Sequence, residues 1–358
     1  MAEKKVNVGN VPNLRFPGFE GEWKDHEIGD ILTIASGKDY KHLDNGDVPV
    51  FGTGGQMTKV NNFLYNGETV FIGRKGTINK PRYFEGKFWT VDTLFYTHSF
   101  INVFPKFVFY IFENINWLNF NEASGVPSLS KSTIDSIEIK IPEIIEQKKI
   151  SNILSIIDQR IQTQSKIIED LKILSNSLAK KLFSKNLIFQ NMEEGEWVTK
   201  QISEVLTIGS GRDYKHLKTG EVPVFGTGGL MTSVDQFLHD GETVCIGRKG
   251  TIDKPMYYNG KIWTVDTLFY THSFKGVLPK FIFYAFRLIN WKEYNEASGV
   301  PSLSKSTIEK IEIDIPSIII QHKIVELLSL IDEKIENEKK VIDKMQKQKS
   351  FLLKSLFI

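Results

Sequence analysis

Three glycine-rich loops carry side chains that could hold an anionic or planar ligand. Their sequences are Ser36-Gly-Lys-Asp-Tyr-Lys-His42, Phe51-Gly-Thr-Gly-Gly55 and Ile72-Gly-Arg-Lys-Gly-Thr77. Phosphate oxygens accept hydrogen bonds from Lys, Arg, Ser, Thr and backbone N–H groups, and a guanine edge accepts two from one Arg. Glycines in such loops let a ligand approach the backbone closely. A solvated turn explains each loop equally well when the loop is taken alone.

All three loops occur a second time, as residues 210–216, 225–229 and 246–251. The Lys41, Arg74 and Lys75 cations return as Lys215, Arg248 and Lys249, and Lys38 returns as Arg212. Two basic loops retained in both copies favour an anionic ligand over a pair of solvated turns.

The residues show no catalytic constellation. Asp135-x-x-Glu138-Ile-Lys140 has the spacing of a nuclease metal site, but its second copy, Glu309-x-x-Glu312-Ile-Asp314, lacks the lysine. We therefore interpret it as an exposed edge strand with alternating charge. His98 and His272 follow aromatic strands and are interpreted as core residues, far from any metal-ligand spacing. The sequence contains neither a phosphate-binding Gly-Lys-Ser/Thr loop nor an amino-methylation motif.

The loops belong to a duplicated unit. Trp23 returns as Trp197, Trp89 as Trp263 and Pro127 as Pro301, each 174 residues later, and the alignment needs no gap from Gly21 onward. About three quarters of the positions in residues 31–100 are identical to those in 205–274. A period this long exceeds the 20–50 residues of solenoid repeats, so it indicates two similar domains.

Each copy divides into the same parts. In the first copy, short β-prone runs at 48–51, 69–72 and 88–91 are separated by Gly and Asn turns. Aromatic residues at helical spacing predict a helix over 105–117, followed by a Ser/Thr-rich turn at 124–130. A strand is expected over Ile134–Ile141, where Pro142 ends it.

Beyond Pro142 the pattern predicts a long helix. Residues 143–183 contain neither Gly nor Pro, and apolar residues recur every seven positions from Ile150 and from Leu154. The second copy repeats this from Ile324 and Leu328. Five heptads in both copies predict a coiled coil, and a helix of about 40 residues would be about 60 Å long. The alternative is a helix lying on its own domain, but that length exceeds what one small domain covers.

The chain order predicts how the two helices pair. A parallel pair would need a connection of about 60 Å, which residues 184–197 are too few to make around a domain, so an antiparallel pair is expected. The stagger that sets polar seam residues together places Gln164 beside Lys349 and Ser175 beside Glu338. Burying a polar residue against an aliphatic one would cost about 1–3 kcal/mol.

The overall composition is that of an ordinary globular protein. The 358 residues carry a net charge of +2, which neither requires nor excludes a polyanion, because a local basic face can hide in a balanced total. The single cysteine, Cys245, aligns with Phe71 and is expected to fill a core in a reducing, cytoplasmic location. The sequence shows neither an apolar signal segment nor a run of the roughly 20 apolar residues that a membrane span needs.

Several segments together resemble the specificity (S) subunits of type I restriction-modification enzymes. They are the opening Pro12-Asn-Leu-Arg-Phe-Pro-Gly-Phe-Glu-Gly-Glu-Trp23, the first and third glycine loops, and Ile141-Pro-Glu-Ile-Ile-Glu-Gln-Lys-Lys-Ile150 with its second copy Ile315–Ile324. The resemblance covers essentially the whole chain in order. It departs from the family pattern in one respect. Family members usually carry two dissimilar recognition domains, whereas the two copies in this chain are nearly the same.

The resemblance implies an α+β fold with two target recognition domains, joined and separated by two long helices in an antiparallel, pseudo-twofold coiled coil. The expected parts are an N-terminal tail (1–15), recognition domain 1 (16–142), a spacer helix with linker (143–189), recognition domain 2 (190–316) and a second spacer helix (317–358). Each domain would read half of a split, near-palindromic site on double-stranded DNA. The candidate DNA-binding residues are Lys38, Tyr40, Lys41, His42, Thr53, Gln56, Lys59, Arg74, Lys75, Arg82, Arg212, Tyr214, Lys215, His216, Thr227, Arg248, Lys249 and Lys254.

The resemblance also implies partners. Two methyltransferase subunits would dock on the helices and use S-adenosylmethionine to methylate adenine, while this chain would bind no cofactor and no metal and would carry no chemistry. Whether motor-nuclease restriction subunits join is left open. Two alternatives remain at this point: a recognition subunit whose partner fuses methyltransferase and nuclease, and a tandem lectin-like or scaffold protein with a coiled-coil stalk.

Overall fold

The computed structural model describes residues 9–184 and 197–358. The predicted N-terminal tail (1–15) and linker (through 189) therefore lie partly outside the described residues. The chain divides into two compact units. Unit 1 comprises Met1–Ser165 with Lys340–Ile358, and unit 2 comprises Lys166–Lys339. Each unit thus contains one copy of the globular repeat and half of each long helix.

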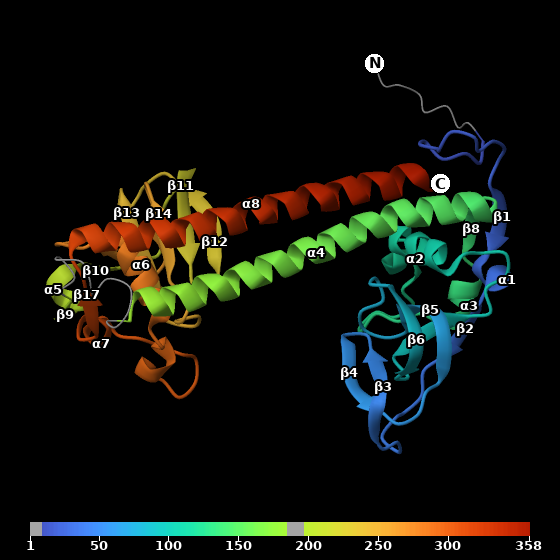
Figure 1. Ribbon diagram of the computed structural model, residues 1–358, viewed down its shortest axis with the longest axis horizontal. Helices are drawn as coiled ribbons and strands as arrows, with labels where there is room; N and C mark the ends of the chain where they lie inside the picture. The colour runs from blue at the N-terminus through green and yellow to red at the C-terminus, as the bar shows by residue number, and fades with distance from the viewer. Residues whose placement is uncertain (1–8, 185–196) are drawn as a thin grey trace. The chain divides into compact units, whose positions relative to one another are not determined.

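Unit 1 is built on a six-stranded sheet with the strand order β2-β7-β5-β6-β3-β4 (Figure 1). A separate antiparallel pair joins β1 to β8, with Lys24 opposite Ile141. The elements are β1 (Lys24–Glu27), α1 (Ile28–Ile31), β2 (Thr33–Ser36), β3 (Asn45–Gly52), β4 (Gly55–Val60), β5 (Tyr65–Gly73), β6 (Arg82–Thr90), β7 (Leu94–His98), α2 (Pro105–Asn114), η1 (Trp117–Phe120), α3 (Lys131–Asp135), β8 (Glu138–Ile141) and α4 (Ile144–Leu182).

Unit 2 has the same plan, but its main sheet is divided into two. The strand that matches β6 is divided into β14 and β15, so one four-stranded sheet (β10-β16-β13-β14) and one three-stranded sheet (β12-β11-β15) replace the six-stranded one. The elements are β9 (Val198–Gln201), α5 (Ile202–Val205), β10 (Thr207–Ser210), β11 (Thr219–Gly226), β12 (Gly229–Val234), β13 (Glu242–Gly247), β14 (Met256–Asn259), β15 (Trp263–Thr264), β16 (Leu268–His272), α6 (Pro279–Leu288), η2 (Trp291–Tyr294), α7 (Lys305–Glu309), β17 (Glu312–Ile315) and α8 (Ile318–Leu356).

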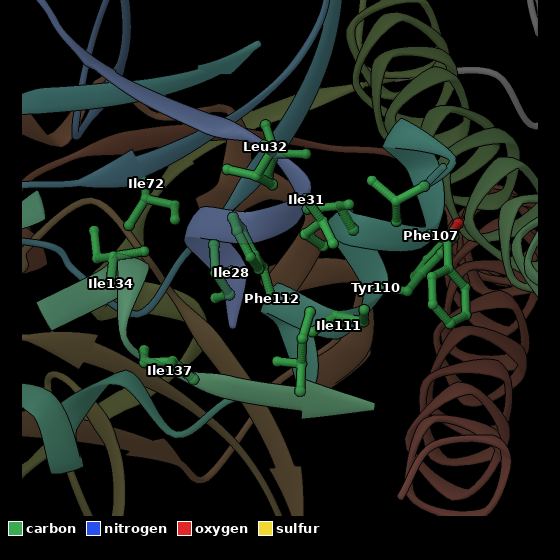
Figure 2. Close-up of a cluster of buried hydrophobic side chains, with 14 of the residues drawn as sticks. Ile28, Ile31, Leu32, Ile72, Phe107, Tyr110, Ile111, Phe112, Ile134 and Ile137 are labelled. Carbon is green, nitrogen blue, oxygen red and sulfur yellow. The ribbon is translucent and has the colours of Figure 1, made fainter. Parts of the chain in front are cut away.

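The main core of unit 1 lies between the sheet and the helices, as Figure 2 shows. Helix α2 begins at Pro105, whose fixed φ and missing N–H suit the first turn of a helix. It buries Phe107, Ile111 and Phe112 against Ile28 and other residues of α1 and α3. Ser130 immediately precedes α3 and caps it, because its side chain accepts a hydrogen bond from Thr133 N.

The first turn of α4 explains the Glu-Gln pair of the Ile141–Ile150 segment. Gln147 is buried, and its side-chain oxygen accepts a hydrogen bond from Phe104 N at 2.8 Å. Its amide nitrogen donates to the carbonyls of Asn102 (3.2 Å) and Pro142 (2.9 Å). Gln321 makes the equivalent three bonds in unit 2. This residue therefore ties the long helix to its own domain in both copies.

Glu146 is also buried but differs between the copies. Its carboxylate accepts two hydrogen bonds from Arg15, both at 2.8 Å, which anchors the N-terminal segment to α4. The aligned residue in unit 2 is Ile320, which is fully buried in an apolar cluster.

The two long helices are antiparallel within each unit. In unit 1, Ile150 and Leu154 near the start of α4 share a core with Leu356 and Phe357 at the end of α8, while Lys349 pairs with Asp158. Figure 1 shows the last turns of α8 beside the first turns of α4. In unit 2 the end of α4 joins a core with the start of α8: Ala179 and Leu182 share it with Ile324 and Leu328. The prediction of two long helices with these buried seam positions is confirmed.

The predicted stagger is wrong. Lys349 Nζ lies 2.7 Å from both Asp158 Oδ1 and Glu113 Oε2. Asp158 precedes the predicted partner Gln164 by six residues, or about 9 Å along the helix. The buried Ser175 hydroxyl has no hydrogen-bond partner among the described residues, so it makes no hydrogen bond to Glu338. The heptad pattern shows only the two long helices and does not reveal that α2 supplies a third wall of the seam.

The predicted strand over Ile134–Ile141 is too long by four residues. Ile134 lies in the last turn of α3, and the strand begins only at Glu138. In the Asp135/Glu138/Lys140 triplet, Lys140 pairs with Asp25 on the neighbouring strand β1. Among the helices of the described ranges, 9–184 and 197–358, none has both the length and the apolar character that crossing a bilayer requires.

Candidate nucleic-acid interface

The first glycine loop, Ser36–His42, is held by a tryptophan. Lys38 N donates to Thr90 O at 2.8 Å, and Lys38 O accepts a hydrogen bond from Trp89 Nε1 at 2.8 Å. Gly37 packs so closely on the residue that follows β6 that an added Cβ would lie 2.0 Å from Val91 O. The backbone is therefore fixed, while the Lys38 and Lys41 side chains are exposed.

The second copy of this loop is held in the same way. Arg212 N donates to Thr264 O at 2.9 Å, and Trp263 Nε1 donates to Arg212 O at 2.9 Å. Lys215 is exposed, as Lys41 is. His42 and His216 lie edge-on to Trp89 and Trp263, with ring centroids 5.9 and 6.1 Å apart. Tyr40 and Tyr214 are partly buried and pack on the small cores around these tryptophans.

The third glycine loop, Ile72–Thr77, is held against the segment that precedes β7. The backbone N–H groups of Arg74 and Lys75 both donate to Thr93 O, at 2.8 and 3.2 Å. The Arg74 guanidinium donates to Asp92 O at 3.3 Å and lies 5.8 Å from the centre of the Phe95 ring. In unit 2 Arg248 bonds Asp266 O at 3.3 Å and lies 5.9 Å from the Phe269 ring.

Ser36 from the first loop and Arg74 and Lys75 from the third line one open cavity of about 530 Å³. Its other walls are residues 92–95 and the loop and helix start around 122–131. The Glu122 carboxylate at its edge accepts hydrogen bonds from the Thr133 and Ser130 hydroxyls, and these lower the pKa of Glu122. The structure therefore brings Ser36 of the first loop beside the cations Arg74 and Lys75 of the third, although the two loops are far apart in the sequence.

The second glycine loop, Phe51–Gly55, lies beside the third. A Cβ added to Gly76 would be 3.8 Å from Thr53 Oγ1, and one added to Gly250 would be 3.6 Å from Thr227 Oγ1. Arg82 is partly buried and donates to Thr53 O at 2.8 Å, so its guanidinium holds this turn. Met256 stands at the aligned position in unit 2 and has no group that could make this bond.

Of the predicted residues in unit 1, only Arg74 and Lys75 line this cavity. Gln56 and Lys59 are exposed on β4, opposite Phe51 and Pro49, and do not line the cavity formed by the first and third loops. Lys254 is exposed on a different hollow, together with Lys292 and Asn295.

Sequence reasoning missed the loop that closes over the third glycine loop. Lys75 and Ser128 form an isolated bridge, as do Lys249 and Ser302, and Gly76 N and Gly250 N donate to the Pro127 and Pro301 carbonyls at 2.8 Å. The valines at the tips, Val126 and Val300, are 59% and 60% exposed. The sequence did carry a signal for this loop, because residues 121–134 are identical to residues 295–308 in the second copy.

His98 and His272 were predicted to be core residues, but both are only partly buried. Burial lowers the pKa of His98 and His272, each of which has a hydrogen bond to the adjacent serine hydroxyl. Cys245 is fully buried, and burial raises its pKa to about 12. Within the described part of the chain, no group of three or more His, Cys, Asp and Glu side chains is placed to hold a metal ion.

Comparison with known proteins matches both copies to one family model. The model describes the type I restriction modification DNA specificity domain, and it matches residues 20–172 and 194–347. A type I restriction enzyme specificity subunit of Methanocaldococcus jannaschii is 26% identical over 249 residues, which are 60% of this chain and 55% of the relative. The chain thus spans about half the length of that relative.

Longer matches cover nearly the whole chain. A putative type I restriction enzyme specificity subunit of Haemophilus influenzae is 21% identical over 344 residues, 87% of each chain. The crystal structure of a type I restriction-modification S subunit from M. genitalium superposes with a TM-score of 0.71 at 20% identity, covering 97% of this chain and 99% of that one. A structure from work on the assembly of a type I restriction-modification system has a TM-score of 0.57 at 12% identity. These superpositions establish the two-domain fold with its long helices.

Proposed function

We propose, from the premise that this chain belongs to the family of type I restriction-modification DNA specificity domains, that it is the subunit that selects the DNA target of such an enzyme. In this proposal each unit reads one half of a bipartite site on double-stranded DNA. The chain itself carries no chemistry.

One observation carries the proposal. In both units the backbones of the first and third glycine loops are fixed by main-chain and tryptophan hydrogen bonds, while the cations on them are exposed. Within the described ranges, Lys38, Lys41, Arg74 and Lys75 have no ion pair. Exposed cations without ion pairs, carried on loops whose backbones are fixed, suit phosphate oxygens, and a guanidinium at such a site suits a guanine edge.

The partner follows from family membership. We propose that methyltransferase subunits dock on α4 and α8 and supply S-adenosylmethionine and the methyl transfer. Both helices carry large apolar side chains that are exposed within their own units, and apolar side chains gathered on a surface are typical of protein contacts. They are Ile156, Ile173, Leu174, Leu327, Leu330 and Phe351.

The likeness of the two copies supports a near-palindromic target. Similar domains read similar half-sites, and if the units face DNA in opposite orientations the half-sites lie on opposite strands. The loops differ mainly at four aligned pairs, which are the candidates for any asymmetry: Gln56/Leu230, Lys59/Ser233, Arg82/Met256 and Asp44/Lys218. At the Arg82/Met256 pair the difference is one hydrogen bond to a turn, since Arg82 donates to Thr53 O and methionine has no such donor.

Methylome sequencing tests the proposal. A host that expresses this chain together with its co-encoded methyltransferase should methylate adenine at one bipartite motif, and a host that expresses either alone should not. Co-purification separates the alternatives. A single partner that contains both methyltransferase and nuclease would favour the fused system. No partner and no shift of duplex DNA would favour a scaffold or lectin-like protein and contradict the proposal.

A further inference from the structure

The two copies differ in charge where the globular domain meets the long helices. In unit 1 this junction contains Tyr110 and Glu113 of α2, Asp158 of α4 and Lys349 of α8. Lys349 Nζ is 2.7 Å from both carboxylates and 5.4 Å from the centre of the Tyr110 ring. Its side chain is only 14% exposed, so this cation is held inside the junction.

Unit 2 has the same junction with its cation moved to another element. The residues aligned with Tyr110, Asp158 and Glu113 are Tyr284, Asp332 and Arg287. Arg287 Nη1 lies 3.3 Å from Asp332 Oδ2, and its Nη2 donates to Asn176 of α4 at 3.2 Å. The tyrosine hydroxyl donates to the aspartate in both units, at 2.8 and 2.9 Å, so the frameworks correspond.

The fourth position completes the exchange. Lys349 aligns with Ser175, which is fully buried at the end of α4 in unit 2. Unit 1 therefore combines a glutamate on the domain with a lysine on the incoming helix. Unit 2 combines an arginine on the domain with a serine on the incoming helix. Each junction therefore contains one cation. The incoming helix supplies it in unit 1, and the globular domain supplies it in unit 2.

This exchange matters because the halves are otherwise similar enough to interchange. Two chains could pair α4 with α4 and α8 with α8, since both helices carry the same heptad seam. Pairing α4 with α4 would place Ser175 beside Glu113 and Asp158, leaving two carboxylates and no cation. Pairing α8 with α8 would place Lys349 beside Arg287, giving two cations to one carboxylate. Uncompensated charges in a partly buried site are strongly destabilising.

We infer that the exchanged residues, Glu113/Arg287 and Ser175/Lys349, form a pairing code that makes the surface of each unit accept the other helix and reject a second copy of its own. The face of α2 and α4 in unit 1 fits a helix that brings a lysine, and the face of α6 and α8 in unit 2 fits a helix that brings a small neutral residue. The burial of Glu113 supports this, since burial raises the pKa of its carboxyl and Lys349 opposes that rise. The code thereby ensures that each helix pair contains one α4 and one α8.

The test is to move the lysine from one helix to the other in the full chain. The double variant Ser175→Lys, Lys349→Ser gives both native junctions the wrong charge and gives the like-with-like pairs the right one. We expect its mass, measured by light scattering and native mass spectrometry, to double relative to the wild-type chain, or its thermal midpoint to fall where it stays a monomer. Adding Glu113→Arg and Arg287→Glu should restore the wild-type mass and midpoint.

The control exchanges a lysine between aligned, exposed positions of the same helices. Lys172 and Gln346 are such a pair, and Lys172→Gln with Gln346→Lys should behave as wild type. A double junction variant with the mass and midpoint of the wild type overturns the inference. So does a fourfold variant that fails to recover them. Should the double variant not fold, recovery by the fourfold variant supports the code, and failure of both counts against it.

Discussion

Neutralising the third glycine loop should weaken DNA binding without disturbing the fold. The variant Lys75→Gln, Lys249→Gln removes one cation from each unit. Both backbones are held independently of the lysine side chains, by bonds from Lys75 N and Lys249 N to Thr93 O and Thr267 O at 3.2 and 3.3 Å. Both side chains are exposed, so the loop geometry should survive the change.

The structure sets the expected size of the effect. Four exposed loop cations per unit allow at most eight phosphate contacts over the two units: Lys38, Lys41, Arg74 and Lys75 with Arg212, Lys215, Arg248 and Lys249. At about 0.9 per contact, the slope of log K against log salt would be at most about −7 for the wild type and about −5.4 for the variant. Between 50 and 200 mM salt, binding would then fall by about 2 × 10⁴ in the wild type and about 2 × 10³ in the variant.

Fluorescence anisotropy of a labelled duplex of arbitrary sequence, titrated at several salt concentrations, measures this slope. The duplex needs no known target, because counterion release does not depend on sequence. A control variant, Lys172→Gln with Lys344→Gln, removes two exposed lysines from the long helices and should leave the slope unchanged. If the loop variant has the wild-type slope, the loops are solvated turns and the proposed interface is wrong.

Four further outcomes are expected. Gln147→Ala should cost about 1–3 kcal/mol in urea denaturation by leaving Phe104 N and two carbonyls unpaired; Gln147→Glu should cost more, because it buries a negative charge against two carbonyl oxygens, and wild-type stability of either variant would contradict this. Trp89→Phe removes the hydrogen bond to Lys38 O and should speed hydrogen exchange in residues 36–42 and weaken DNA binding, while unchanged exchange would show that the tryptophan does not hold the loop. The Cys245 thiol, whose pKa burial raises to about 12, should resist a thiol reagent at pH 8 until the chain is unfolded, so rapid labelling of the folded chain would count against its burial. The methylated motif should be an interrupted palindrome or near-palindrome with half-site centres about 10 bp apart, and two unrelated half-sites would refute the symmetry argument.

Patterns that repeat along one element were predictable from the sequence. The heptads place Ile150, Leu154, Ile324 and Leu328 in the seam, and all four are buried. The predicted helix over 105–117 appears as α2, Pro105–Asn114, followed by a short 3-10 turn. Each of these features depends on a local period that the sequence displays directly.

Features that depend on a third element were not predictable in this way. The stagger failed because Glu113 of α2 enters the seam and attracts Lys349, a contact invisible to heptad counting. The predicted strand over 134–141 starts too early in the sequence, because Ser130 caps a short helix whose last turn includes Ile134. Arg82 was expected at the ligand, yet it bonds Thr53 O, and nothing in its local sequence indicates which neighbouring turn it reaches.

The two kinds of difference between the copies have different physical consequences. A change in a recognition loop, such as Lys38 to Arg212, acts alone, since each loop is held by its own backbone and neither residue has an ion pair in the described part of the chain. A change at the helix junction cannot act alone, because Glu113 requires a cation and Arg287 excludes a second one. Junction charges must therefore change in sets, and two units with nearly identical loops can still have junctions that do not interchange. Under the proposed function, this combination gives one chain two similar reading surfaces and fixes which helix closes which unit.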